Sequence, residues 1–307
     1  MILCSWILSP VMTIIKTIVT LVRTIVETVC EWVSTVIHTV KTIVEEVCSW
    51  LPWPLNKLCD LVTKLIDVFE TVWDWVCHTV IHTIFEIIEY IIVYIEYILK
   101  WVCWLIDWIL FRWIDYLLCR LGLEPKRCLH VCIKILTDEK GVPAATSAEV
   151  DIAITKAQTI LDHCNVEIIE TQRLFIKKAK FLNSTGCDFG SMFTSFFKWM
   201  SWNTCRCCNM ITVYIVNNMT NASGCAFPGT DFVIVARSNG RPDPVSFMGN
   251  ILVQEAGHLC DLWAHTSDPD NVMTDQSGGT SDQVTEHQCC IIRSSRFVSA
   301  CIKRHKG

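Results

Sequence analysis

Residues 251–265 read Ile251-Leu-Val-Gln-Glu-Ala-Gly-His-Leu-Cys-Asp-Leu-Trp-Ala-His265, and the chain continues with Thr-Ser-Asp-Pro-Asp-Asn-Val-Met273. Gln254 lies four residues before His258 and Glu255 lies three before it, so the three side chains share one side of a helix. A lone histidine and glutamate on one helix face are usually structural. The residues that follow, Asn271-Val272-Met273, and the order of the neighbouring elements favour a helix that carries a functional site.

This stretch resembles the zinc-binding helix of the metzincins, a family of zinc peptidases. The family motif has two histidines one helical turn apart with a general-base glutamate between them, then a third histidine and a Met-turn beneath the metal. Glu255 and His258 match the second and fifth motif positions, and Asn271-Val272-Met273 looks like the Met-turn. The resemblance covers about residues 128–300. It implies a zinc ion, Glu255 as the catalytic base, and His258 and His265 as metal ligands.

Three positions depart from the family motif. Gln254 replaces the first histidine and offers only a neutral amide oxygen, which is a poor zinc ligand beside imidazole. Asp261 replaces the glycine of the turn and provides an oxygen donor one turn after His258. His265 follows His258 by seven residues, where the family spacing is six. Gln254 and Asp261 are therefore the two candidates for a third zinc ligand.

Residues 128–307 have the sequence pattern of an α+β domain. Apolar and β-branched runs predict strands, and an apolar face that begins at an N-cap, Ser147, predicts a helix. This order agrees with the metzincin resemblance, which implies a twisted mixed sheet and an active-site helix. A Cys-rich insertion, 187–208, interrupts the strands, and we expect disulfides there rather than a metal. The predicted strands are Leu129–Leu136, Val166–Ile176, Ile211–Val216 and Asp231–Ala236; the helices are Ser147–Cys164 and a closing helix at about Thr280–Val298.

Residues 1–121 differ in composition, and Gly122–Arg127 is the predicted linker between the two halves. The segment Arg23–Val33 recurs as Lys41–Leu51, an offset of 18 residues, which equals five α-helical turns. Apolar residues there recur in steps of three and four, which predicts a helix in spite of the many β-branched residues. A second amphipathic stretch runs from about Leu55 to Leu121.

The cysteines of this half predict how its two helices are arranged. In three pairs of cysteines the two residue numbers add up to the same total, as opposite residues of an antiparallel hairpin do. The midpoint between the two cysteines of each pair coincides with Leu51-Pro-Trp-Pro-Leu55, where prolines break a helix. The helical repeat alone also places cysteines on one face of each helix. We predict a long antiparallel α-helical hairpin with its turn near residues 51–55 and three disulfides: Cys4–Cys103, Cys30–Cys77 and Cys48–Cys59.

The second helix of the hairpin has an unusually apolar surface with a narrow polar stripe. Between Ile84 and Leu118 the charged residues recur mostly at helical spacing, and no uninterrupted apolar run reaches the ~20 residues of a transmembrane helix. Three interpretations stay open: packing against copies of the hairpin, contact with a membrane interface where tryptophan is favoured, or a multimeric pore lined by the stripe. A surface of this kind requires a partner, so self-association or membrane association is expected through residues 1–121.

The 19 cysteines and the formal net charge of −5 restrict the compartment and the partners. The cysteines are not arranged as CxxC pairs with the spacing of zinc knuckles, so a disulfide-rich protein in an extracellular or cell-surface compartment is expected. The apolar N-terminus lacks the basic start and small-residue cleavage site of a secretion signal, so no clear cleavable signal peptide is predicted. The acidic balance and the absence of a long basic run give no reason to expect nucleic acid as a partner.

Three hypotheses about function follow. The first is a zinc-dependent endopeptidase that acts on a peptide or protein substrate and is tethered or clustered by the hairpin. The second is a catalytically inactive metzincin-like fold with a binding or structural role, which the replacement of the first histidine by Gln254 motivates. The third assigns the main role to the hairpin, as a membrane-active or filament-forming element that carries the C-terminal half.

Overall fold

The structure is a computed structural model, and the chain in it divides into two compact units. Met1–Pro10 with Glu96–Gly307 form one unit, and Val11–Ile95 form the other. We call them the sheet unit and the hairpin unit. The structure describes residues 3–49, 55–107, 112–184, 187, 192, 194–205, 209–220, 222–227, 229–237, 243–274 and 281–301.

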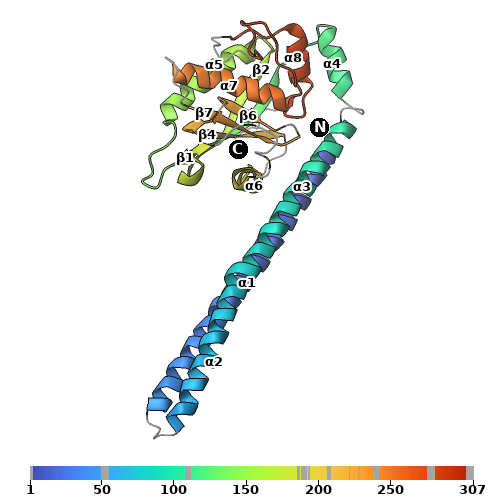
Figure 1. Ribbon diagram of the computed structural model, residues 1–307. Helices are drawn as coiled ribbons and strands as arrows, with labels where there is room; N and C mark the ends of the chain where they lie inside the picture. Colours follow the sequence, from blue (N-terminus) through green and yellow to red (C-terminus); the bar gives the residue numbers. More distant parts are fainter. Residues whose placement is uncertain are drawn as a thin grey trace, which may run out of the picture. The chain divides into compact units, whose positions relative to one another are not determined.

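Two long antiparallel helical stretches make up the hairpin unit (Figure 1). The first stretch belongs to helix α1. The second runs through α2, a π-helical segment η1 and the first part of α3. Their bounds are α1 Leu3–Ser49, α2 Leu55–Trp75, η1 Val76–Ile81 and α3 His82–Asp107. The long helix predicted from the apolar periodicity is therefore present despite its β-branched residues.

Two disulfides join the stretches, Cys30–Cys77 and Cys48–Cys59, with Cα atoms 5.9 and 5.7 Å apart. They are two of the three pairs predicted from the cysteine positions. The third predicted pair, Cys4–Cys103, involves the Cys4 side chain, which lies outside the described residues, as do residues 51–54 of the predicted turn. The unit is thus stapled at two levels of its length, and each staple restricts the unfolded chain.

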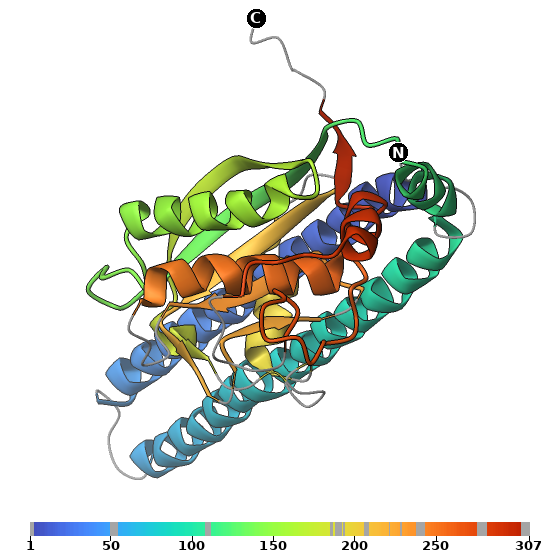
Figure 2. The ribbon, with the colours of Figure 1, turned by 90° about the horizontal axis from the view of Figure 1, so that it is seen from above.

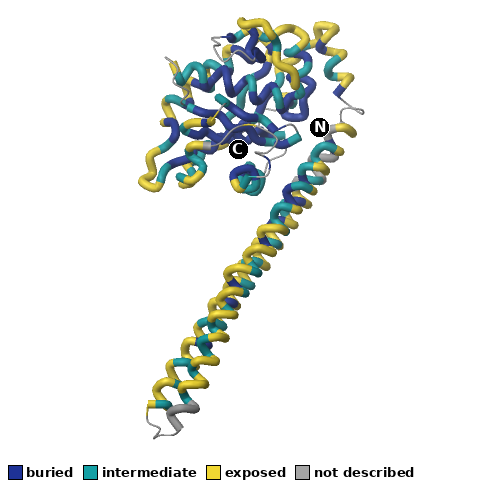
Figure 3. The backbone as a smooth tube through the Cα atoms, viewed as in Figure 1, coloured by how far each residue is buried: buried dark blue, intermediate teal, exposed yellow. Residues whose placement is uncertain are grey.

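The surface where the two stretches meet, which we call the seam, contains ion pairs as well as disulfides. Arg23 pairs with Glu89 at 2.7 Å, and Lys41 pairs with Asp67 at 2.6 Å, so each pair joins one stretch to the other. Most of the large apolar side chains of this unit are exposed instead, and Figure 3 colours much of the hairpin as exposed. Disulfides and ion pairs therefore hold the hairpin in place of a large apolar core.

One helical stretch, Cys59–Cys103, is long and apolar enough to cross a membrane by length and composition. An 18-residue window in it has a mean hydropathy of 1.6. The criterion applied to the sequence, an uninterrupted apolar run, does not detect this stretch because charged residues interrupt it.

The sheet unit is an α+β fold with a mixed sheet in the order β2-β1-β4-β7-β6. Four strands run parallel, whereas β6 pairs antiparallel with β7, and β8 pairs antiparallel with one end of β1. The strands are β1 Arg127–Thr137, β2 Val166–Lys177, β4 Met210–Val216, β6 Gly224–Ala226, β7 Phe232–Ala236 and β8 Val298–Ala300; β3 Asn183–Ser184 and β5 Asn218–Met219 form a separate pair.

Helices cover both faces of this sheet. On one face α5 and α7 lie side by side over alternate residues of the central strands (Figure 1, Figure 2). On the other face α6 packs its aromatic side chains against the intervening residues, since Phe197 contacts Phe232 and Trp199 contacts Tyr214. The helices are α4 Trp113–Arg120, α5 Ser147–Asp162, α6 Ser195–Trp202, α7 Pro244–Leu259 and α8 Glu286–Arg293, with a 3-10 turn at Ala179–Phe181.

The four strands and the first helix predicted for this half are present, with shifts of one or two residues at their ends. The N-cap of α5 is Thr146 rather than Ser147, because the Thr146 side chain and Glu149 form a reciprocal capping box. The closing helix is shorter than expected, because Ser294 caps α8 and β8 follows it. The short strand β6 and the helix α6, inside the Cys-rich insertion, were not predicted.

Among the described residues, five disulfides cross-link the sheet unit, which makes the protein disulfide-rich and agrees with an extracellular location. One of them ties α4 to α8, so residues 122–127 connect two parts of this unit. Among the described cysteines Cys260 is the free one, and it is buried. The five are Cys119–Cys290, Cys128–Cys301, Cys132–Cys205, Cys164–Cys289 and Cys187–Cys225.

Candidate metal centre

Helix α7 carries the candidate site, and local sequence fixes both of its ends. The Asp243 side chain accepts a hydrogen bond from the Ser246 N–H, and Pro244 occupies the first turn, where an amide donor has no helical partner. The helix ends at Leu259, and Asp261 follows in the left-handed region with φ of 75°. The chain reverses at this turn, so the residues after it return toward the helix.

The imidazole rings of His258 and His265 converge after this turn, with 3.0 Å between their Nε2 atoms. The Nδ1 atom of His258 lies 2.7 Å from the carbonyl oxygen of Leu262. Because a carbonyl oxygen only accepts, Nδ1 carries the proton, and Nε2 of the neutral ring keeps its lone pair on the His265 side. Burial lowers the pKa of His258 and favours this neutral form. A metal ion requires a histidine in this state.

The Glu255 carboxyl group lies between α7 and strand β6, and only 7% of the residue is exposed. Burial raises the pKa of Glu255 to about 8, and a hydrogen bond from the Ala226 N–H acts in the opposite direction. A Cβ atom on Gly224 would lie 2.7 Å from Oε1 of Glu255, so the glycine allows β6 to approach the helix closely. Glu255 is thus an acid–base group with a strongly perturbed pKa, three residues from His258.

Gln254 and Met273 are also brought to α7. The Gln254 amide donates from Nε2 to the carbonyl oxygen of Thr274 at 3.0 Å. Met273 is fully buried, and its Sδ atom lies 3.0 Å from the place that a Cβ on Gly257 would occupy. The Asn271 side chain holds this segment by accepting the Met273 N–H at 2.9 Å. The segment that looks like a Met-turn therefore lies against α7, next to the helical turn of His258.

Asp261 is engaged by a cation instead of facing the histidine pair. Its carboxylate forms an ion pair with Arg112, a residue that is 5% exposed, and accepts a hydrogen bond from Trp263 Nε1 at 3.2 Å. Among the described residues, Asp261 does not join the two histidines in a set whose ligand atoms all lie within 4.8 Å of one another. Aspartate tolerates left-handed backbone better than most side chains, so it fills the position that the family motif gives to glycine.

Two other clusters in the described part of the chain contain metal-ligating side chains. One joins Glu124 to Cys119 and Cys290, and the other joins Glu167 to Cys128 and Cys301. In both clusters the cysteines form a disulfide, so no thiolate is present to bind a metal. The histidine pair on α7 therefore remains the candidate metal centre.

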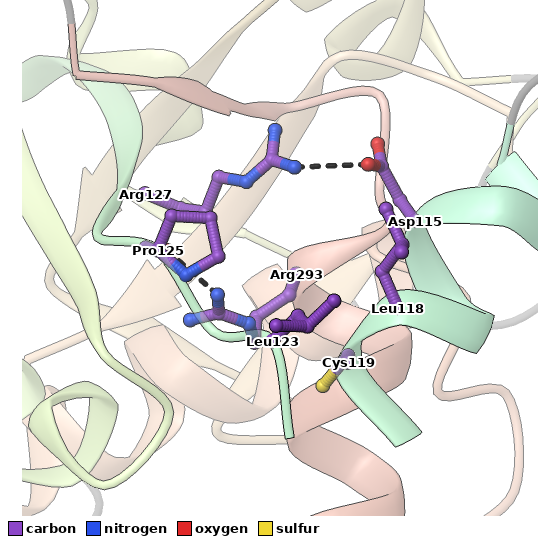
Figure 4. A pocket seen from close by; sticks show the side chains of 7 residues that line it. All are labelled: Asp115, Leu118, Cys119, Leu123, Pro125, Arg127 and Arg293. Atoms are coloured by element: carbon purple, nitrogen blue, oxygen red, sulfur yellow. Dashed lines mark hydrogen bonds and ion pairs between the residues drawn. The ribbon is translucent and has the colours of Figure 1, made fainter. Parts of the chain in front are cut away.

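A cavity of about 290 Å³ opens beside the first of these disulfides. Figure 4 shows its polar side chains: Arg127 forms an ion pair with Asp115 at 2.9 Å, and Arg293 donates to the Pro125 carbonyl oxygen at 2.6 Å. The second guanidinium nitrogen of Arg293 donates to the carbonyl oxygen of Cys164. Both arginines are thus used to join α4, α8 and the start of β1.

The sequence pattern missed the groups that surround the predicted site residues. Leu262, Thr274 and Ala226 act through backbone atoms, which any residue type provides, so no side-chain pattern marks them. Arg112 lies 149 positions before Asp261 in the chain, and only the fold brings the two together. A lone arginine in an otherwise apolar stretch was the one signal available for it.

Comparisons with known proteins add no family to this description. A scan against models of protein families matches none of them. A search of curated proteins finds no similar sequence.

Proposed function

We propose that the sheet unit is a zinc-dependent endopeptidase whose metal is held by His258 and His265. The observation that carries the proposal is the convergence of the two Nε2 atoms, 3.0 Å apart, on the helix that also bears the buried Glu255. The Met273 segment against the same helix supports it, because the resemblance to metzincins extends to that segment.

The donor set fits zinc in part. Two nitrogen ligands at about 2.0–2.1 Å from a tetrahedral zinc are about 3.3 Å apart, close to the observed separation of the histidines. Catalytic zinc sites usually have three protein ligands, so one more donor is required. Gln254 is the better third candidate, because it is one turn before His258 on the same helix face, whereas Arg112 neutralises Asp261. Its amide oxygen is the weakest ligand of the three.

Zinc in this position would polarise the scissile carbonyl group and lower the pKa of a water molecule at the open coordination position. Glu255 would accept the proton of that water and deliver it to the leaving amine. Its raised pKa belongs to the metal-free carboxyl group, and a nearby cation favours the ionised form. Burial also excludes competing water from the carboxylate.

Strand β6 offers a place for an extended peptide substrate. It is the last strand of the main sheet path, and the Ala226 N–H on its outer edge already points at Glu255. No strand pairs with that edge among the described residues. An extended chain can add to such an edge by main-chain hydrogen bonds, which would place its backbone beside the general base.

Metal content and peptidase activity test this proposal together. We expect one zinc per chain in the purified protein, loss of zinc in His258→Ala, and retained zinc without activity in Glu255→Ala. Cleavage of an unfolded protein and of a random fluorogenic peptide mixture gives the activity readout. Substoichiometric zinc after growth with added zinc, or activity that survives Glu255→Ala, refutes the catalytic proposal.

A catalytically inactive binding fold is the second candidate, and one observation favours it. The Gln254 amide donates to Thr274, a contact that fixes the side chain without any metal. In that case the protein binds no stoichiometric zinc, and His258→Ala leaves peptide binding to the β6 edge unchanged.

A further inference from the structure

The seam of the hairpin divides each helix into two flanks of opposite character. On α1 the seam follows Met12, Lys16, Arg23, Cys30 and other residues spaced by three and four. The residue before each seam residue is apolar, and the residue after it is polar. The preceding residues are Val11, Ile15, Ile18, Val22, Ile25, Val29, Val36, Val40, Ile43 and Val47; the following ones are Thr13, Thr17, Thr20, Thr24, Glu27, Glu31, His38, Thr42, Glu45 and Ser49.

The second stretch obeys the same rule. Its seam passes through Cys59, Glu70, Cys77 and Phe85 among others. The exposed apolar residues Val62, Leu65, Phe69, Val72, Ile84 and Ile91 precede seam residues, and Asp60, Lys64, Asp67, Thr71, Asp74, His78 and Glu86 follow them.

Because the two stretches are antiparallel, both apolar flanks lie on the same face of the hairpin. A two-fold axis normal to the hairpin exchanges the helices and reverses their direction, yet it leaves each face in place. A position one residue before the seam is rotated by 100° in the same sense in both helices. Over its described residues from Val11 to Ile91, the hairpin unit therefore has one apolar face and one polar face.

The apolar face approaches the size of a protein interface. The sixteen apolar flank residues named above, ten of α1 and six of the second stretch, are between 37% and 61% exposed. These 16 side chains compare with the roughly 20–30 residues that each partner contributes to a stable complex. The polar face needs no such cover, because hydroxyl groups such as those of Thr24 and Thr42 bond to the carbonyl four residues earlier.

Charge decides what covers the apolar face. Val11–Ile95 contain ten acidic and five basic residues, a formal net charge of −5. Helices that lie on anionic membranes have lysine or arginine beside their apolar face, whereas Arg23 and Lys41 here lie in the seam and pair with acidic residues. A second copy buries the apolar face and leaves both acidic polar faces in water.

We propose that the apolar faces of two copies of this chain pack against each other and form a four-helix bundle from two hairpins. The interface is isologous, since the same face serves both chains. It consists largely of isoleucine and valine, and it requires neither zinc nor peptidase activity. The proposal is therefore independent of the proposed function of the sheet unit.

The test compares charged substitutions on the two faces of the same helix in the full-length protein without detergent. Ile25→Lys with Ile43→Lys places two charges on the apolar face. Thr24→Lys with Thr42→Lys places the same charges at neighbouring positions on the polar face. Light scattering after size exclusion is expected to give the mass of two 35.1 kDa chains for the wild type and the polar-face variant. The apolar-face variant is expected to dissociate at least 100-fold more readily and to give the mass of one chain.

Peptide mapping of the Cys30–Cys77 disulfide and helical circular dichroism show whether each variant keeps the hairpin. If either is lost in Ile25→Lys with Ile43→Lys, Ile25→Gln with Ile43→Gln repeats the comparison. A monomeric wild type at about 10 μM overturns the proposal, as does equal dissociation of both variants. Flotation with vesicles of phosphatidylcholine, with and without phosphatidylglycerol, tests lipid as the occupant. Binding of the wild type to vesicles without a dimer in buffer also overturns it.

Discussion

Replacement of Glu255 by glutamine measures how much the buried carboxyl group lowers the free energy of unfolding. The pKa of Glu255 is about 8 in the folded protein, against 4.5 for an unperturbed glutamate. A carboxyl pKa that is raised on folding contributes stability that is present below pH 4.5 and is lost as the pH rises toward 8. Glutamine has nearly the same shape and does not titrate. The stability of the variant therefore does not fall in this way as the pH rises.

The magnitude follows from the two pKa values. At pH 7 the unfolded glutamate lies about 2.5 units above its pKa, and each unit corresponds to about 1.36 kcal/mol. The buried carboxyl group therefore lowers the free energy of unfolding by about 3 kcal/mol at pH 7 relative to pH 4.5. Glu255→Gln is expected to match the wild type near pH 4.5 and to exceed its stability by about that amount at pH 7.

Urea unfolding of zinc-free protein, with a chelator present and the disulfides intact, is the appropriate assay. The chelator matters because a bound cation favours the carboxylate and shifts the comparison. Glu139→Gln serves as the control, since the Glu139 side chain is 76% exposed and its loss does not remove a buried charge. Parallel stability curves for wild type and Glu255→Gln between pH 4.5 and 8 would show that Glu255 is not buried as described.

Three further predictions concern the metal ligand, the turn and the hairpin. Gln254→His is expected to raise zinc affinity at least tenfold by adding an imidazole ligand, as measured by chelator competition; unchanged affinity places position 254 outside the metal centre. Asp261→Ala is expected to lower the free energy of unfolding by about 3–5 kcal/mol, because it leaves a buried arginine unpaired and strains left-handed backbone, whereas Asp261→Asn keeps the backbone tolerance and costs less. Cys30→Ser with Cys77→Ser opens a loop of 47 residues and is expected to remove about 4 kcal/mol in chemical unfolding; a loss under about 1 kcal/mol contradicts the staple.

The sequence was sufficient for the hairpin because its information is local and repeated. A period of three and four residues specifies a helix, and the cysteine positions specify which residues lie opposite each other. The central strands were predictable for a similar reason, since buried parallel strands appear as uninterrupted apolar runs. Strand β6 escaped prediction because three residues, Gly224–Ala226, are too few to establish a period.

Disulfide pairing in the sheet unit could not be predicted from the sequence for a different reason. Cys119 and Cys290 are 171 residues apart, and Cys128 and Cys301 are 173 apart. Their partners are set by how α4 meets α8 and how β1 meets β8 in space. A sequence with many cysteines fixes only that disulfides are expected, not which ones form.

Gln254 and Asp261, the two residues that differ from the metzincin motif that this helix resembles, have different physical consequences. At position 261 the motif requires a backbone conformation, and Asp261 adopts it with φ of 75° while Arg112 neutralises its charge. The turn therefore still returns His265 to His258, even with one extra residue between them. At position 254 the motif requires a donor atom, and no backbone adjustment converts an amide into an imidazole. The fold thus accommodates Asp261 at the glycine position of the motif, whereas the proposed zinc site requires the Gln254 amide oxygen or a ligand from the substrate as its third donor.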